Sequence, residues 1–366
     1  MPVSEIPEGI SSNPLLHHEA VLSHSNSFSF EMEKDAAGCR AFNRNYIVGD
    51  IMYDITALGE LLVDFTECGT SEAGMRIFER NPGGAPANVL SAAARFGRRT
   101  AFLGKVGDDM HGRFLRQTLL AAGIGVEGLV MAQDVFTTLA FVALDDRGER
   151  HFSFARKPGA DTCLRTEELD GEVLRHTRIL HVGSLSLTDE PARSATFAAV
   201  EQAKAAGALI SYDPNYRAVL WPDSAAAAAR MRSMVPFADV MKLSDEETAL
   251  LTGTADPAEA ARRLLAQGVS CAAVTLGAKG ALVATAEGIR TVPGFSVAAV
   301  DTTGAGDAFW GGFLHRLLAL DKTVLTTEDA ADCARWGCAT AALCITKRGA
   351  IPAMPSLDEV TALLAQ

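Results

Sequence analysis

The sequence has no uninterrupted apolar run of about 18 residues, the length that a helix needs to cross a lipid bilayer. It also lacks a basic start followed by an apolar core, so we expect no secretory signal. Its seven cysteines form no C-x-x-C pair and are scattered, as at Cys68, Cys163 and Cys271. Disulfide frameworks and zinc sites need patterned cysteines, so we expect reduced, buried thiols in a cytoplasmic protein.

Positive charge is also scarce, because 33 Lys and Arg stand against 45 Asp and Glu, a formal net charge of −12. Binding to nucleic acid or to an anionic membrane needs a basic face, so we expect neither partner. A hydrophobic content of 48% within 366 residues is enough for a large core. We therefore expect one large α/β domain or one domain with an appendage.

Several motifs that mark known kinds of active site are absent as well. No G-x-x-x-x-G-K-[ST] occurs, which excludes a P-loop nucleotide site, and neither G-x-S-x-G nor H-E-x-x-H is present. One G-x-G-x-x-G occurs at residues 123–128, but it follows a helical pattern, whereas a dinucleotide fingerprint follows a strand. We interpret it as the turn that ends a helix, which disfavours a dinucleotide oxidoreductase.

The first 51 residues differ from the rest of the chain. They are polar, contain the serine-rich SHSNSFSF and show no sustained hydrophobic periodicity. We predict that residues 1–51 form an N-terminal extension without a packed fold, with a docked arm as the alternative. Met52 opens a typical strand pattern and is a plausible true start, so a wrongly assigned start is a further interpretation of this segment.

From residue 52 onward, apolar runs alternate with helical patterns and are joined by short glycine turns. The expected strands lie at Ile55–Phe65, Ala101–Val106, 179–185, Ala208–Tyr212, 240–243 and Val269–Leu276. This alternation predicts an α/β fold, a three-layer α/β/α sandwich around a mostly parallel central sheet. No Gly/Ser-rich linker interrupts it, so we expect residues 52–366 to form one domain.

One part of the chain breaks the alternation. Two strand patterns, Thr137–Ala143 and Glu149–Ala155, are joined by DDRG at Asp145–Gly148 with no helix between them, which predicts a hairpin. We expect this hairpin to form an antiparallel flap over a site. Arg156 lies at its end.

The most informative stretch is VDTTGAGDAF at residues 300–309, followed by the Trp310-Gly-Gly step. Val297–Val300 resembles a strand end, and helical spacing begins near Gly304. Small residues let a ligand approach the first amides of that helix, which suit a phosphate, and Asp307 in the first turn could accept a proton. The alternative is that Asp301 or Thr302 merely caps the helix. Because a cap explains neither the second Asp nor the Trp-Gly-Gly step, we predict a phosphate site that contains a base.

Three further polar positions have two interpretations each. Asp64 lies at the expected carboxyl end of the first strand, where parallel sheets bind ligands, but it could be a solvated strand-end residue. Asn88, in the first turn of an alanine-rich helix, either caps that helix or contacts a ligand. The acidic SDEE at Ser244–Glu247 is either a plain helix start or a place where Glu247 holds Mg²⁺ through water.

These motifs together resemble the PfkB (ribokinase-like) family of carbohydrate kinases. Two signatures carry the resemblance, GG-x-x-x-N with its alanine-rich helix at residues 83–97 and DTTGAGDAF at residues 301–309. It extends from about Ile55 to Pro355. GELLVDF, FARKPGAD, HVGSLSL, SYDPNYRAVLWPD and KLSDEE resemble the fructokinase branch. The resemblance implies a ribokinase-like fold with a small β-sheet lid, built from about residues 66–80 and 137–156.

The resemblance also implies roles for individual residues, in five groups. They are Asp307 as catalytic base; Gly304, Ala305 and Gly306 as the anion hole; Asp64, Gly84, Asn88 and Arg156 at the sugar; Ser244, Thr275 and Gly277 at the nucleotide; and Glu247 for Mg²⁺, with Asp301 and Thr303 for a monovalent cation. Two positions depart from family patterns. Ser244 replaces the Asn of the N-x-x-E motif, and Ala85 replaces a Lys usual in ribokinases, which argues against ribose.

By this resemblance we expect ATP-dependent phosphorylation of D-fructose at its 6-hydroxyl, with Mg²⁺ and K⁺ as cofactors. The partners would be a sugar and MgATP, and a homodimer through the lid is a further expectation because exposed apolar surfaces often form interfaces. The alternatives are a kinase of another sugar such as 2-keto-3-deoxygluconate and a sugar-sensing relative without turnover.

Overall fold

The computed structural model of the chain describes residues 52–144, 150–322 and 324–366. The extension expected at residues 1–51 and the turn expected at Asp145–Gly148 lie outside the described residues. Among the helices that are described, none is both long and apolar enough to cross a membrane.

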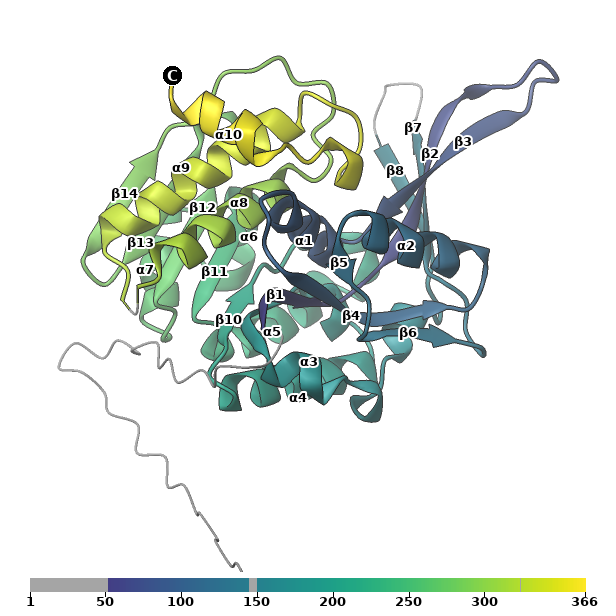
Figure 1. Cartoon of the computed structure of the whole chain (residues 1–366), viewed down its shortest axis with the longest axis horizontal. Helices are drawn as coiled ribbons and strands as arrows, with labels where there is room; N and C mark the ends of the chain where they lie inside the picture. Colours follow the sequence, from purple (N-terminus) through teal and green to yellow (C-terminus); the bar gives the residue numbers. More distant parts are fainter. Residues whose placement is uncertain (1–51, 145–149, 323) are drawn as a thin grey trace, which may run out of the picture. The chain divides into compact units, whose positions relative to one another are not determined.

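A ten-stranded central sheet runs through the protein in the order β14-β13-β12-β11-β10-β9-β1-β4-β5, with β6 paired to β4 (Figure 1). Its strands are β1 Tyr53–Leu58, β4 Thr100–Gly107, β5 Ile124–Gly125, β6 Leu129–Ala132, β9 Thr177–Val182, β10 Leu209–Tyr212, β11 Val240–Ser244, β12 Cys271–Thr275, β13 Ala281–Thr285 and β14 Gly288–Val292. All pairs are parallel except β12–β13 and β13–β14. The mostly parallel sheet is confirmed, whereas the β13–β14 hairpin was not anticipated.

Helices cover both faces of this sheet. They are α1 Ala85–Arg95, α2 Met110–Ala121, α3 Gly171–Arg175, α4 Ala192–Ala205, α5 Ser224–Met234, α6 Asp245–Thr252, α7 Pro257–Leu265, α8 Ala305–Leu320, α9 Thr327–Cys344 and α10 Leu357–Leu364. Alternate strand residues enter two separate cores. Ala273 belongs to the core that contains side chains of α1, α2, α8 and α9, and Ala272 belongs to the core that contains side chains of α3 to α7. This period of two, with helices on each side, is the expected three-layer sandwich.

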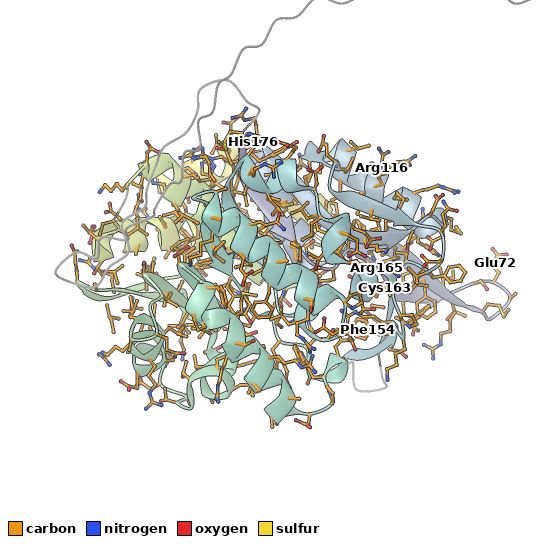
Figure 2. All side chains as sticks on the ribbon, turned by 90° about the horizontal axis from the view of Figure 1, so that it is seen from below. Glu72, Arg116, Phe154, Cys163, Arg165 and His176 are labelled. Atoms are coloured by element: carbon orange, nitrogen blue, oxygen red, sulfur yellow. The ribbon has the colours of Figure 1, made fainter. Side chains whose placement is uncertain are left out.

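A second sheet of four strands, in the order β3-β2-β7-β8, stands apart from the first. Its strands are β2 Leu62–Thr70, β3 Arg76–Gly83, β7 Leu139–Leu144 and β8 Arg150–Ala155. The β7–β8 hairpin is antiparallel, as its sequence predicts, and β2 joins it in parallel to β7. The β2–β3 hairpin reaches away from the helices, with Glu72 at its tip (Figures 1 and 2).

The single strand predicted at Ile55–Phe65 is wrong, because the chain divides there into β1 and β2, which belong to different sheets. The break falls at Gly59, where a side-chain carbon would lie 2.7 Å from the Pro86 Cγ at the start of α1. Consequently Asp64 lies within the small sheet and not at the carboxyl end of β1.

The strand end predicted at Val297–Val300 is also wrong. No strand is formed there, and Val300 is 62% exposed. The backbone amides of Val300 and Asp301 both donate to the carbonyl of Ile345, just after α9, at 2.8 and 3.2 Å. The segment before α8 is therefore held by the end of α9 instead of by the sheet.

The Trp310-Gly-Gly step positions α8 by packing. A side-chain carbon on Gly311 would lie 2.5 Å from the Ala92 Cβ on α1, and one on Gly312 would overlap Thr340 on α9. Trp310 itself is fully buried, and its indole donates to the Ser211 hydroxyl on β10 at 2.7 Å. The two glycines therefore let α8 lie close to both α1 and α9. This is a packing role, whereas the sequence had led us to associate the Trp-Gly-Gly step with the phosphate site.

The substitution Gly311→Val should lower the free energy of unfolding by about 1–3 kcal/mol, because the added carbons overlap Ala92 in a close-packed interior. Urea denaturation of the purified protein measures this. Gly288→Val is the matched control, since the first added carbon there meets only the Thr327 hydroxyl at 3.7 Å. An equal loss in both variants would contradict the packing role of Gly311.

Candidate active site

The N-terminus of α8 is the centre of the candidate site. The helix begins after Gly304, which has a left-handed φ of 76° and no side-chain cap. A side-chain carbon at this position would lie 2.6 Å from the Ala350 Cβ, so the turn requires glycine. Neither Asp301 nor Thr302 caps the helix, which excludes the simpler interpretation of this motif. The positive end of the α8 dipole therefore remains open to an anion.

Asp307 lies in the first turn of α8 and is 7% exposed. Asn88 on α1 donates its Nδ2 to the Asp307 Oδ2 at 2.8 Å, and Asn215, after β10, donates its Nδ2 to the Oδ1 at 3.3 Å. Burial raises the pKa of Asp307 to about 6, opposed by the Asn88 hydrogen bond and the nearby Lys242 charge. At neutral pH this carboxyl is ionised yet more basic than an ordinary Asp, which suits proton abstraction.

The structure excludes the capping interpretation of Asn88. The residue that caps α1 is Gly84, and no side chain caps this helix. While the Asn88 Nδ2 binds Asp307, its Oδ1 is buried and has no hydrogen-bond partner in the described part of the chain. A buried polar atom left without a partner costs about 1–3 kcal/mol, so this acceptor favours contact with a ligand.

Two glycines bring the start of α1 against Asp64 and Glu60. A side-chain carbon on Gly83 would overlap the Asp64 carboxylate, and one on Gly84, where φ is 121°, would overlap the Glu60 carbonyl. The Asp64 carboxylate accepts no hydrogen bond from any other described residue, and burial raises its pKa to about 6, opposed by the charge of Arg217. The same Arg217 acts on Asp307, so the two carboxylates lie near one guanidinium.

Glu60, which follows β1, has a similar environment. It is 3% exposed, its Oε1 accepts the Ala85 amide at 2.8 Å, and its Oε2 is buried with no described partner. Burial raises the pKa of Glu60 to about 7.

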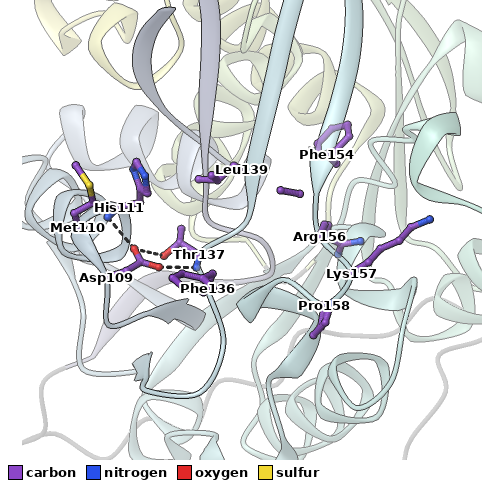
Figure 3. Close-up of a pocket in the computed structure, with 11 residues that line it drawn as sticks. Asp109, Met110, His111, Phe136, Thr137, Leu139, Phe154, Arg156, Lys157 and Pro158 are labelled. Carbon is purple, nitrogen blue, oxygen red and sulfur yellow. Dashed lines mark hydrogen bonds between the residues drawn. The ribbon is translucent and has the colours of Figure 1, made fainter.

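Arg156 lies in a cluster of its own. Its Nε donates to the Asp161 Oδ2 at 2.8 Å, its Nη1 to the Thr188 hydroxyl at 2.9 Å and its Nη2 to the Leu185 carbonyl at 2.9 Å. All three nitrogens therefore have protein partners. Arg156 lines a hollow of about 660 Å³ beside Asp109, Phe136 and other residues (Figure 3). Among the described residues that line this hollow, Arg156 is the only predicted site residue.

The predicted nucleotide residues gather at the carboxyl ends of two neighbouring strands. Ser244 ends β11 and pairs in register with Thr275, which ends β12. Gly277 follows in a turn with φ of 58°, and a side-chain carbon there would meet no atom within 4 Å. Open space next to a left-handed turn is compatible with a ligand that approaches the backbone.

Glu247, in the first turn of α6, ties two segments together. Its Oε2 accepts the Ser244 amide at 2.8 Å and its Oε1 accepts the Tyr216 amide at 2.6 Å. The first contact is one half of a capping box, which agrees with the plain interpretation of SDEE as a helix start. The second reaches the loop after β10, so Glu247 also fixes the backbone next to Asn215.

Asp301 and Thr303 form a separate turn before α8. The Asp301 Oδ1 accepts the amide and the hydroxyl of Thr303 at 3.0 and 2.7 Å, and its Oδ2 accepts the Gly349 amide at 3.1 Å. The carboxylate thus joins the turn that starts α8 to the segment after α9.

The structure adds a group of residues that the sequence interpretation missed. Lys242 on β11 pairs with Asp213 at 2.7 Å, and the Asp213 Oδ1 accepts the amide of Asn215, whose φ is 45°. Asp213, Asn215 and Arg217 stand in DPNYR directly after β10. The rule that ligands bind at the carboxyl ends of parallel strands could have identified this motif.

The sequence and the structure were each compared with known proteins. The model of the pfkB family carbohydrate kinases matches residues 43–357. Fructokinase-2 of Solanum lycopersicum is 44% identical over 314 residues, which cover 85% of this chain and 95% of that protein. Probable fructokinase-4 of Arabidopsis thaliana is 45% identical over 314 residues, with 85% and 96% covered.

Solved structures of similar fold include the fructokinase of Xylella fastidiosa with bound ATP. Its TM-score is 0.80 at 36% identity, over 86% of this chain and 99% of that one. The Vibrio cholerae fructokinase with fructose, ADP and calcium bound has a TM-score of 0.77 at 38% identity, over 86% and 99%. The aminoimidazole riboside kinase of Salmonella enterica, with its riboside and an ATP analogue bound, has a TM-score of 0.74 at 30% identity. The match covers 86% of this chain and 100% of that one.

The substitution Asp64→Asn should stabilise the protein in a pH-dependent way. Because the folded pKa of Asp64 is about 6 and its usual value is 3.8, ionisation of this side chain opposes folding as the pH rises through 6. Near pH 8 the variant should gain about 3 kcal/mol of unfolding free energy, and the gain should shrink between pH 6 and pH 4. Urea denaturation at several pH values measures it. A gain that does not vary with pH would contradict the raised pKa.

Proposed function

The chain belongs to the pfkB family of carbohydrate kinases, and from that premise we propose that it transfers the γ-phosphoryl group of ATP to the 6-hydroxyl of D-fructose. A carbohydrate kinase transfers phosphate to a sugar hydroxyl, and membership of the family supports this reaction class. The observation that supports the mechanism is the Asp307 carboxylate, buried in the first turn of α8 and held by two amide side chains. The choice of fructose is supported by the named activities of the relatives.

In the proposed reaction, Asp307 takes the proton of the sugar hydroxyl while the hydroxyl oxygen attacks the γ-phosphorus. The raised pKa of Asp307, about 6, makes it a better proton acceptor than an ordinary Asp. The amides of Gly304 and Gly306, together with that of Ala305, which here donates to the Thr302 carbonyl at 3.2 Å, would stabilise negative charge on the transferring group. Little covalent chemistry is left for the protein, so positioning and electrostatics supply most of the catalysis.

We propose that the sugar lies between α1 and the small sheet, against Asp64, Gly84 and Asn88. The buried Oδ1 of Asn88 and the Asp64 carboxylate both lack described protein partners, which suits binding to sugar hydroxyls. Arg156 would act on the sugar side by holding the segment around Leu185 in place. Ser244, Thr275 and Gly277 would contact the nucleotide at the ends of β11 and β12.

Two cations complete the proposal. Each Glu247 oxygen already accepts one backbone amide but keeps a further lone pair, which fits a water-mediated contact with Mg²⁺. Across the described residues, no group of three or more His, Cys, Asp or Glu could hold a metal by itself. When bound, Mg²⁺ would supply charge that neutralises phosphate oxygens. Asp301 and Thr303 provide oxygen atoms for K⁺ next to the anion hole.

The small sheet would serve as a lid, with the segments about 66–80 and 137–156 closing over the sugar to exclude water. Its Phe65, Phe78 and Phe141 form an aromatic cluster in which Phe78 and Phe141 are 37% and 38% exposed. Such a surface supports the proposal of a homodimer through the lid.

The function is tested by measuring ADP release with MgATP across fructose, ribose, 2-keto-3-deoxygluconate, adenosine and aminoimidazole riboside, with and without K⁺. We expect turnover with fructose that increases with K⁺. Turnover with a different acceptor alone would keep the mechanism and replace the substrate. Nucleotide binding without turnover on any acceptor would favour a non-catalytic sensor.

The substitution Asp307→Asn should abolish turnover and leave ATP affinity nearly unchanged, because it removes the proton acceptor and no nucleotide contact. Steady-state kinetics and calorimetric titration with ATP measure the two effects. Asp358→Asn is the matched control, since Asp358 also lies in the first turn of a helix, α10, but is exposed. Near-normal turnover of the Asp307 variant would refute its role as base.

A further inference from the structure

A buried lysine stands next to the anion hole. Lys242 lies on β11 and is only 5% exposed, with its Nζ 2.7 Å from the Asp213 Oδ2. Burial favours the neutral amine, but the carboxylates of Asp213 and Glu247 outweigh it and raise the pKa of Lys242. The side chain therefore carries a full positive charge in the interior at neutral pH.

The position of this charge is fixed by Gly306. A side-chain carbon on Gly306 would lie 3.1 Å from the Lys242 Nζ, so the ammonium group lies directly against the first turn of α8. Glycine at this position leaves room for the lysine. The charge also acts on the Asp307 carboxylate, one residue further along the helix. Lys242 thus reaches the place where the anion hole and the proposed base meet.

The hydrogen bonds of this ammonium group are incomplete. A lysine has three N–H donors, and in the described part of the chain only the Asp213 carboxylate accepts one. A buried charge is normally paired and fully hydrogen-bonded, because leaving donors unsatisfied in the interior is unfavourable. Two donors therefore remain for an acceptor that binds beside Gly306.

We propose that Lys242 is a phosphate-binding residue that donates hydrogen bonds to the γ-phosphoryl group at the N-terminus of α8. The inference rests on the proposed phosphoryl transfer. The amides of α8 offer only partial charges, whereas Lys242 adds a full charge at short range, and lysine binds phosphate as a point charge. Lys242 forms no covalent bond and moves no proton in this role.

The competing explanation is that Lys242 serves only as the counter-ion of Asp213. The Asp213 Oδ1 holds the amide of Asn215, so loss of the lysine could disturb Asn215 and thereby Asp307. The double variant Asp213→Asn/Lys242→Met separates the two explanations. It removes both charges together, and the side-chain carbonyl oxygen that takes the place of the Asp213 Oδ1 can still accept the Asn215 amide.

The experiment compares the affinities of ADP and of AMP-PCP, a non-hydrolysable ATP analogue that carries the γ-phosphoryl group, by calorimetric titration in the presence of Mg²⁺. In both Lys242→Met and the double variant, we expect AMP-PCP to bind about 10-fold to 100-fold more weakly, the range for a hydrogen bond to a charged group, with ADP nearly unchanged. Lys204→Met is the matched control, a half-buried lysine that pairs with Asp239.

Three results would overturn the proposal: unchanged AMP-PCP affinity, equal weakening of both nucleotides, or a loss in Lys242→Met that the double variant restores. No sugar is needed, so a wild-type protein that fails to phosphorylate fructose would refute the proposed substrate and leave this test intact. If neither variant folds, a crystal structure of the wild-type protein with AMP-PCP decides, since an Nζ beyond about 3.5 Å from every γ-phosphoryl oxygen would refute the contact.

Discussion

The buried carboxylate of Asp307 is the constraint on which the rest of the site depends. It must stay charged in an interior that disfavours charge, and the structure meets this requirement with two amide donors and a helix N-terminus. Each donor comes from a different segment, Asn88 from α1 and Asn215 from the loop after β10. The packing of α1 against α8, and the loop conformation held by Asp213 and Glu247, therefore serve the same side chain.

Close backbone approach is what makes this convergence possible. Glycines at residues 83, 84, 304, 306 and 311 stand where a side-chain carbon would contact or overlap a neighbour, namely the Asp64 carboxylate, the Glu60 carbonyl, Ala350, Lys242 or Ala92. Four of these five lie in the two motifs that identify the family. The glycines of these motifs thus serve both packing and chemistry, because the absence of a side chain lets the functional groups come within reach of one another.

The site also contains buried polar groups without described hydrogen-bond partners. The Asn88 Oδ1 and the Glu60 Oε2 have no described partners, and burial raises the pKa of Glu60, Asp64 and Asp307. Such groups destabilise the folded protein without a ligand, and binding of a polar ligand would relieve that penalty. The polar groups that would bind a ligand in this site therefore lower the stability of the folded protein when no ligand is bound.

The sequence by itself determined the layered α/β architecture, the helix that begins after Gly304 and the β7–β8 hairpin, because hydrophobic period and glycine turns are local properties. It also determined the family, because two separate motifs matched. Only the tertiary structure divided Ile55–Phe65 into strands of two sheets and tied Val300 to the end of α9. Only it brought Lys242, Asp213 and Asn215 to Asp307. Contacts between residues 29 to 219 positions apart depend on chain packing, which no local pattern records.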